Sequence, residues 1–187
     1  MEKQYRLAPG SDRGLAPVIS ERRIAAGVRR LASQIQSDYA GRNPLLVGVL
    51  RGAFIFLADL VRELDMPLEV EFVAMESYRG TSSTGHVEMT RDVGVPVQGR
   101  HVLVVEDIVD TGLTTGYLLE HLRVKGPASV KLCALLDKPA RHLREVPIDY
   151  LGFTVPDRFL VGYGLDVDQK YRHLPAIYAI EETEDGH

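Results

Sequence analysis

The stretch His101–Thr115, HVLVVEDIVDTGLTT, decides how this chain folds. It opens with four apolar residues in a row, from Val102 to Val105, without the polar alternation of a half-exposed strand. Such a run is typical of a strand that is buried on both faces, as in a parallel sheet. Two carboxylates, Glu106 and Asp107, follow where we expect this strand to end, and a turn and an apolar helical pattern come next. The stretch therefore predicts a strand, a turn and a helix of an α/β fold.

The turn after this strand has the chemistry of a phosphate site. Gly112 lets the backbone bend and approach a ligand closely, and the unpaired N–H groups that open a helix suit an anion. Hydroxyl donors come from three neighbours, Thr111, Thr114 and Thr115. Glu106 and Asp107 would repel a bare phosphate, but they can bind sugar hydroxyls or a hard metal ion. The alternative is an ordinary strand whose helix has an N-cap, but two adjacent buried acids are costly unless they are used. The pattern indicates a phosphorylated sugar.

Length and composition limit the class of protein. The 187 residues favour one domain, and 45% hydrophobic and 26% charged residues are ordinary for a globular protein. The net charge of -4 argues against a broad nucleic-acid surface. No apolar run reaches the roughly 18 residues that span a membrane, and the N-terminus lacks an apolar signal core. The single cysteine, Cys133, stands among apolar residues, so it is expected to be a core thiol rather than a nucleophile. These features predict a protein of the reducing cytoplasm without nucleic-acid or membrane partners.

A second strand, turn and helix precede the first. Leu45–Leu50 (LLVGVL) reads as a buried strand, Arg51 and Gly52 follow, and apolar residues from Phe54 onward recur at helical spacing. A glycine beside an arginine at the start of a helix suits a phosphate group. Taken alone, a plain turn with a solvent-facing arginine would be the better interpretation.

The rest of the chain supplies further elements. Ser20 can cap a helix that ends near Gly41, whereas residues 1–17 are expected to be a loop or an arm. The polar segment Ser77–Asp92 is expected to be a mobile lid or, as the alternative, an idle hairpin. The other expected strands are Leu68–Met75, Ser129–Leu136, Tyr150–Val155 and Ile177–Ile180.

The motif VLVVEDIVDTGLTT resembles the phosphoribosyl-pyrophosphate (PRPP) motif of type I phosphoribosyltransferases, and EDIVDTG resembles their hypoxanthine-guanine branch. The likeness extends over about residues 20–180, with five separate motifs in the family's order. It implies a mainly parallel sheet flanked by helices, in a single domain over residues 1–187. The core would span about residues 20–136, and the N-terminal arm with residues 137–180 would form a small hood over the base.

The resemblance also implies a reaction of purine salvage. The 5-phosphoribosyl group of PRPP would move to N9 of hypoxanthine or guanine, giving IMP or GMP and pyrophosphate. Mg²⁺ would be the cofactor, the partners would be small-molecule substrates, and the enzyme would be a homodimer or a homotetramer.

Site residues follow from the same resemblance, motif by motif. Asp110 would be the general base that takes the proton from purine N7. PRPP would contact Glu106, Asp107, Asp110, Thr111, Gly112, Leu113 and Thr114. The pyrophosphate would contact Leu50, Arg51, Gly52 and Arg172, with a non-proline cis peptide expected between Leu50 and Arg51. The purine would contact Lys138, Phe159, Leu160 and Asp166. The metal ligands would be Glu106, Asp107 and Asp166, and the lid would begin at Ser77 and Tyr78.

Two departures and several alternatives accompany this interpretation. Leu113 stands where some members carry a lysine or another polar residue, and Arg51 stands where some carry a lysine. An ammonium donates hydrogen bonds only, so Lys138 favours a 6-oxopurine over adenine. Without the motif, Lys138 would be read as a surface lysine and Phe159 as a core residue. The alternative functions are a phosphoribosyltransferase for xanthine or adenine, and an RNA-binding regulator on the same fold.

Overall fold

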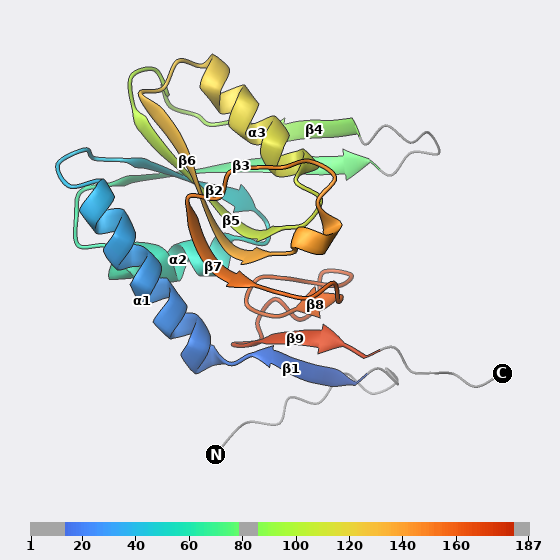
Figure 1. Ribbon diagram of the computed structural model, residues 1–187. Coiled ribbons are helices and arrows are strands. Elements are labelled where there is room, and N and C mark those ends of the chain that lie inside the picture. The colour runs from blue at the N-terminus through green and yellow to red at the C-terminus, as the bar shows by residue number, and fades with distance from the viewer. Residues whose placement is uncertain (1–13, 79–85, 182–187) are drawn as a thin grey trace.

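The main sheet has the strand order β4-β3-β2-β5-β6-β7 and is parallel except for β4, which runs antiparallel to β3 at one edge (Figure 1). The computed structural model describes residues 14–78 and 86–181. The strands of this sheet are β2 (Leu45–Leu50), β3 (Glu69–Tyr78), β4 (His86–Arg91), β5 (His101–Val109), β6 (Ser129–Asp137) and β7 (Tyr150–Thr154). The predicted α/β fold with a mainly parallel sheet is therefore confirmed.

Helices cover both faces of this sheet (Figure 1). The helices α1 (Glu21–Asp38) and α2 (Phe54–Glu63) share one apolar core with one face, and α3 (Leu113–Val124) shares a second core with the other face. The central strands contribute to both cores, because alternate residues of β2 and β5 point to opposite faces. This explains why their sequences are continuously apolar. Ser20 caps α1 as expected, since its hydroxyl accepts a hydrogen bond from Arg23 N.

A second, three-stranded sheet lies beside the carboxyl end of β7 in the order β1-β9-β8 (Figure 1). It consists of β1 (Leu15–Ile19), β8 (Leu160–Val161) and β9 (Ile177–Ile180), all antiparallel. The expectation of a loop over residues 1–17 was wrong from Leu15 onward, because these residues pair with β9. Residues 1–13 lie outside the described part of the chain. β7 falls within the range expected for the hood, yet it pairs with β6 in the main sheet.

Three element bounds differ from the sequence prediction. β5 continues through Glu106 and Asp107 to Val109, because its pairing with β6 continues as far as Val109 and Asp137. The helix after the motif begins at Leu113, inside the threonine-rich turn. The polar segment, expected as a lid or alternatively as a hairpin, contains strand at both ends, since Ser77 pairs with Val87 in antiparallel orientation.

Within residues 14–78 and 86–181, no helix is long and apolar enough to cross a bilayer.

Candidate active site

The phosphate loop, residues Asp110–Thr115, connects the carboxyl end of β5 to α3. Gly112 is the N-cap of α3 with φ +77°, the left-handed conformation that glycine adopts without strain. A Cβ atom at Gly112 would lie 2.1 Å from the carbonyl oxygen of Arg144, so the neighbouring chain also requires a glycine. The carbonyl oxygen of Thr111 accepts hydrogen bonds from Leu143 N at 2.9 Å and Arg144 N at 3.1 Å. Leu143 and Arg144 therefore hold the loop in place. The N–H groups that open α3 suit an anion, although that of Leu113 also donates to Thr111 Oγ1 at 3.4 Å.

Glu106 and Asp107 are buried at the end of β5, with exposed fractions of 7% and 9%. Burial, followed by the charge of Asp107, raises the pKa of Glu106 well above its usual range. Burial also raises the pKa of Asp107 to about 6, and the nearby Arg172 opposes this shift. Glu106 Oε2 is buried and has no hydrogen-bond partner among residues 14–78 and 86–181. A buried acceptor of this kind needs a donor or a cation, which sugar hydroxyls or a metal ion can supply.

The turn after β2 lies directly against this acidic pair. The peptide bond between Leu50 and Arg51 is cis, as the resemblance implied. A Cβ atom at Gly52 would lie 1.8 Å from Asp107 Oδ2, and one at Gly164 would lie 2.1 Å from the carbonyl oxygen of Gly52. Three segments distant in sequence therefore meet at van der Waals distance.

Arg172 lies beside Asp166 on the same side of the site. Its Nη1 donates to the carbonyl oxygen of Gly164 at 2.7 Å, and its Nη2 lies 2.8 Å from Asp166 Oδ1. Gln169, which sequence reasoning missed, accepts hydrogen bonds through Oε1 from Arg51 at 2.9 Å and from Arg172 at 3.1 Å. Both arginines that were predicted for the pyrophosphate are thus brought together.

Asp110 faces a second chain segment that sequence reasoning also missed. Arg141 Nε donates to Asp110 Oδ1 at 3.2 Å and lies 3.7 Å from Asp157 Oδ1. Arg141 belongs to the 3-10 helix η1 (Pro139–Arg141), which follows Lys138. The backbone N–H of Lys138 donates to the carbonyl oxygen of Val109 at 3.0 Å. The predicted base and the predicted purine lysine are therefore held close to one another.

The segment 156–166, here called the purine segment because the resemblance predicts that it binds the base, has an exposed aromatic ring. Phe159 is 57% exposed, so the interpretation as a core residue was wrong, and stacking on a base stays a prediction. Leu160, in β8, is buried and pairs with Ala179. Lys138 is 8% exposed, so it is not the surface lysine of the alternative interpretation. Ser77 and Tyr78 end β3, and residues 79–85 of the expected lid lie outside the described residues.

The proposed metal ligands suit Mg²⁺ without forming a complete site by themselves. Glu106, Asp107 and Asp166 are oxygen donors from one region, and the free Glu106 Oε2 is a suitable ligand atom. In the part of the chain that the structure describes, however, no group of three or more Asp, Glu, His or Cys side chains is arranged to hold a metal. Mg²⁺ usually binds through one or two carboxylates together with substrate phosphates and water. The residues present fit that mode.

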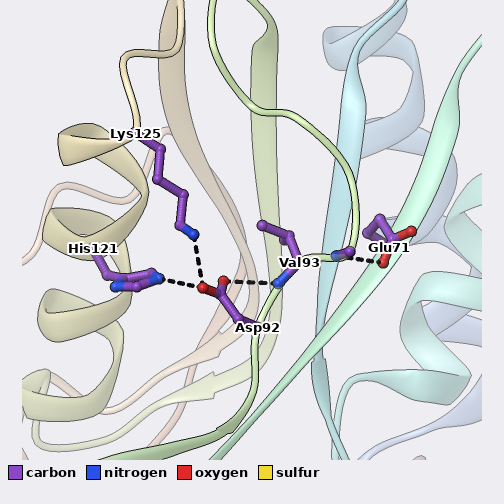
Figure 2. A network of polar contacts seen from close by, with 6 residues as sticks. Glu71, Asp92, Val93, His121 and Lys125 are labelled. Atoms are coloured by element: carbon purple, nitrogen blue, oxygen red, sulfur yellow. Dashed lines mark hydrogen bonds and ion pairs between the residues drawn. The ribbon is translucent and has the colours of Figure 1, made fainter.

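A polar network anchors the far end of α3 to the segment after β4 (Figure 2). Asp92 Oδ2 accepts from His121 at 2.9 Å and from Lys125 at 2.7 Å, and Asp92 Oδ1 accepts from Val93 N at 2.7 Å. Burial acts against ionisation, but the Lys125 and His121 hydrogen bonds outweigh it and lower the pKa of Asp92. The helix that starts in the phosphate loop is thereby fixed at both ends.

Comparisons with known proteins show similarity to phosphoribosyltransferases. The family model described as "Phosphoribosyl transferase domain" matches residues 19–168. A hypoxanthine-guanine-xanthine phosphoribosyltransferase of Tritrichomonas foetus is 45% identical over 161 residues, which are 86% of this chain and 88% of the relative. A hypoxanthine-guanine phosphoribosyltransferase of Streptococcus pneumoniae is 43% identical, over 88% of this chain and 92% of the relative.

Solved structures of hypoxanthine and hypoxanthine-guanine phosphoribosyltransferases have a fold similar to that of this chain. The crystal structure of a hypoxanthine-guanine phosphoribosyltransferase from Bacillus anthracis superposes with a TM-score of 0.84 at 37% identity, over 91% of this chain and 100% of the other. A hypoxanthine phosphoribosyltransferase from Staphylococcus aureus gives a TM-score of 0.86 at 35% identity, over 91% and 94% of the two chains.

Proposed function

The chain belongs to the phosphoribosyl transferase family, and from this premise we propose that it transfers the phosphoribosyl group of PRPP to hypoxanthine or guanine. The observation that carries the proposal is the buried pair Glu106 and Asp107, with a free acceptor on Glu106, directly beside a phosphate loop that opens α3. A phosphorylated sugar has both groups that this arrangement binds: hydroxyls for the carboxylates and a phosphate for the loop.

The loop from Asp110 to Thr115 binds the 5-phosphate through its backbone N–H groups and threonine hydroxyls. Leu113 adds no polar group, but its backbone N–H remains part of the loop. Glu106 and Asp107 orient the ribose hydroxyls, which replace the water that burial has removed from these carboxylates. Holding the sugar in this way presents its anomeric carbon to the incoming base.

Arg51, Gly52 and Arg172 bind the leaving pyrophosphate at the other end of the sugar. Guanidinium groups suit phosphate oxygens because their donors match them in pairs. Mg²⁺, held by the carboxylates Glu106, Asp107 and Asp166 in part and otherwise by PRPP and water, would neutralise charge on the pyrophosphate.

Asp110 acts as the general base for the purine. Arg141 binds Asp110 through Oδ1, so we assign Oδ2 as the oxygen that takes the proton from purine N7. Lys138 donates to the exocyclic oxygen at position 6, and Phe159 stacks on the ring. An adenine amino group cannot accept from Lys138, which favours hypoxanthine and guanine.

A second candidate is the same reaction with xanthine as an additional substrate. It is favoured by one observation, that a relative 45% identical to this chain is named a hypoxanthine-guanine-xanthine phosphoribosyltransferase. The RNA-binding regulator lacks such support, because the net charge is -4 and Asp110 is retained. We further propose a cytoplasmic enzyme that assembles as a homodimer or a homotetramer, which light scattering in solution would test.

The test is pyrophosphate release from PRPP and Mg²⁺ with hypoxanthine, guanine, xanthine and adenine supplied separately. Turnover with the first two and none with adenine is expected. Turnover with xanthine as well would extend the base range and keep the mechanism. Measurable PRPP binding without release for any base would refute the enzyme and favour the regulator. Omitting Mg²⁺ should abolish release, and adding it back should restore it.

A further inference from the structure

Gln169 joins two guanidinium groups that come from segments distant in sequence. Its Oε1 accepts from Arg51 Nη1 at 2.9 Å and from Arg172 Nη2 at 3.1 Å, although Arg51 is 118 positions away in sequence. The two like-charged groups, here called the arginine pair, would repel each other without an acceptor between them. One neutral oxygen therefore occupies the point on which both cations converge.

The two arginines depend on Gln169 to different degrees. Arg172 is also held by the carbonyl oxygen of Gly164 and by Asp166. For Arg51, Gln169 is the one side-chain hydrogen-bond partner within residues 14–78 and 86–181. The orientation of the Arg51 guanidinium therefore rests on this amide.

The turn that carries Gln169 is held in an unusual conformation. Asp168, Gln169 and Tyr171 have φ values of 50°, 63° and 74°, a region that glycine and asparagine adopt more easily. The Gln169 N–H donates to Asp166 Oδ2 at 2.9 Å, and Val167 and Lys170 are joined by two backbone hydrogen bonds. Strained backbone of this kind is concentrated at ligand sites, where it aims a side chain.

We propose that Gln169 is a positioning residue for the pyrophosphate group. In the free protein its amide oxygen occupies the place between the arginine pair that an oxygen of the pyrophosphate takes in the complex, and it keeps Arg51 aligned until then. A neutral acceptor suits this task, because it leaves the positive charge of the arginine pair uncompensated, so that a negatively charged phosphate oxygen binds both guanidinium groups more strongly and displaces it. This inference rests on the proposed function, in which Arg51 and Arg172 bind pyrophosphate.

Three variants separate the reach of the amide from the conformation of the turn. Gln169→Asn keeps an amide and suits the positive φ, but it is one methylene too short to reach both arginines. Gln169→Ala removes the acceptor. Gln169→Glu replaces it with a carboxylate, which holds both arginines by charge-assisted bonds and resists displacement. Gln98→Glu, in an exposed connection remote from the site, is the matched charge control.

The probe is inorganic pyrophosphate with Mg²⁺, titrated calorimetrically into the full chain. Gln169→Asn and Gln169→Ala should each weaken binding by about 3- to 10-fold, the effect of losing one modest hydrogen bond. Gln169→Glu should weaken it by about 10-fold or more. In turnover, KM for PRPP should rise in parallel while kcat at saturating PRPP stays within about 2-fold. Gln98→Glu should match the wild type in all of these.

The melting temperature provides the decisive contrast. Gln169→Asn should melt at or above the wild-type temperature while it binds pyrophosphate less tightly. Wild-type pyrophosphate affinity in both Gln169→Asn and Gln169→Ala would overturn the inference, and so would losses that follow the melting temperature. Failure of the proposed function would be distinct, since the wild-type protein would then release no pyrophosphate from PRPP with any base.

Discussion

The phosphate loop after β5 and the turn at residues 166–172 face the same proposed substrate, but they are built differently. The phosphate loop follows a buried strand and opens a helix, so its place in the fold can be recognised from local sequence, although Leu143 and Arg144 also hold it. The turn at 166–172 belongs to no helix or long strand, and its residues with positive φ are not glycines. Local sequence therefore indicates the first region, whereas the contact of the second region with Arg51 depends on a distant segment. Variants that affect one region without the other can test this difference.

The largest effect is expected at Asp110, where the phosphate loop meets the base. Asp110→Asn removes the proton acceptor while keeping the shape of the side chain. We expect kcat to fall by about 10²- to 10⁴-fold, the usual range for the loss of general acid–base catalysis. Steady-state turnover with hypoxanthine measures this. A rate close to that of the wild type would remove Asp110 from the mechanism.

The second largest effect is expected at Gly112, where a substitution tests whether the approach of Arg144 requires a glycine. Gly112→Ala combines backbone strain with a contact of 2.1 Å to the Arg144 carbonyl oxygen. We expect a loss of about 2 kcal/mol or more in unfolding free energy and a KM for PRPP raised by about 10-fold. Gly41→Ala is the matched control, since Gly41 has a similar φ of +72° and nothing within 4 Å.

Urea unfolding and PRPP saturation curves of the two variants measure the contrast. Gly41→Ala should lose only the strain, about 1 kcal/mol, and keep the wild-type KM. Equal losses in both variants would mean that the approach of Arg144 contributes nothing to the phosphate loop.

This contrast explains how far the sequence could predict the fold. The strands β2 and β5 and the helices that follow them were predicted, because apolar periodicity and glycine placement are local signals. β1 was missed, and the strand part of the polar segment was expected only under the hairpin alternative. β1 is a short apolar segment that contains Pro17, and β4 is mostly polar, so neither has the pattern of a buried strand, and pairing with β9 or β3 makes them strands.

The same distinction applies to the candidate site. Glu106, Asp107 and the phosphate loop could be proposed from one continuous motif. Gln169 and Arg141 could not, because their contacts depend on how separate segments meet. The strained turn gave no signal either, since no glycine stands at its positive-φ positions. Only a tertiary structure relates Gln169 to Arg51.

Arg141 joins the phosphate loop to the purine segment, and we expect its substitution to have a third, smaller effect. Arg141→Gln removes the cation between Asp110 and Asp157, so the Asp110 carboxylate loses one fixed partner. Because Arg141 is 45% exposed, we expect kcat/KM for hypoxanthine to fall by only about 3- to 10-fold. Initial rates at varied hypoxanthine measure it.

Asp157→Asn is the companion variant for this bridge. It leaves the Arg141 contact to Asp110 in place, so it should have less effect on kcat/KM than Arg141→Gln. A larger loss in Asp157→Asn would mean that Arg141 serves the purine segment rather than the proposed base.

The smallest effect is expected at the other end of α3, where Asp92 anchors the helix without touching the site (Figure 2). The pKa of Asp92 is lowered in the folded protein, so its stabilisation is present above the unfolded value of 3.8 and is lost as pH falls through the folded value. Since its side chain is 37% exposed, Asp92→Asn should cost only about 0.5–1 kcal/mol at pH 7 and less at pH 2–3. Urea unfolding at both pH values measures the difference, and Lys125→Met tests the same ion pair from its other side.

An equal cost at both pH values would mean that packing rather than charge holds this end of α3. In that case the phosphate loop would depend on its own sequence and on Arg144, and not on an ion pair at the far end of its helix.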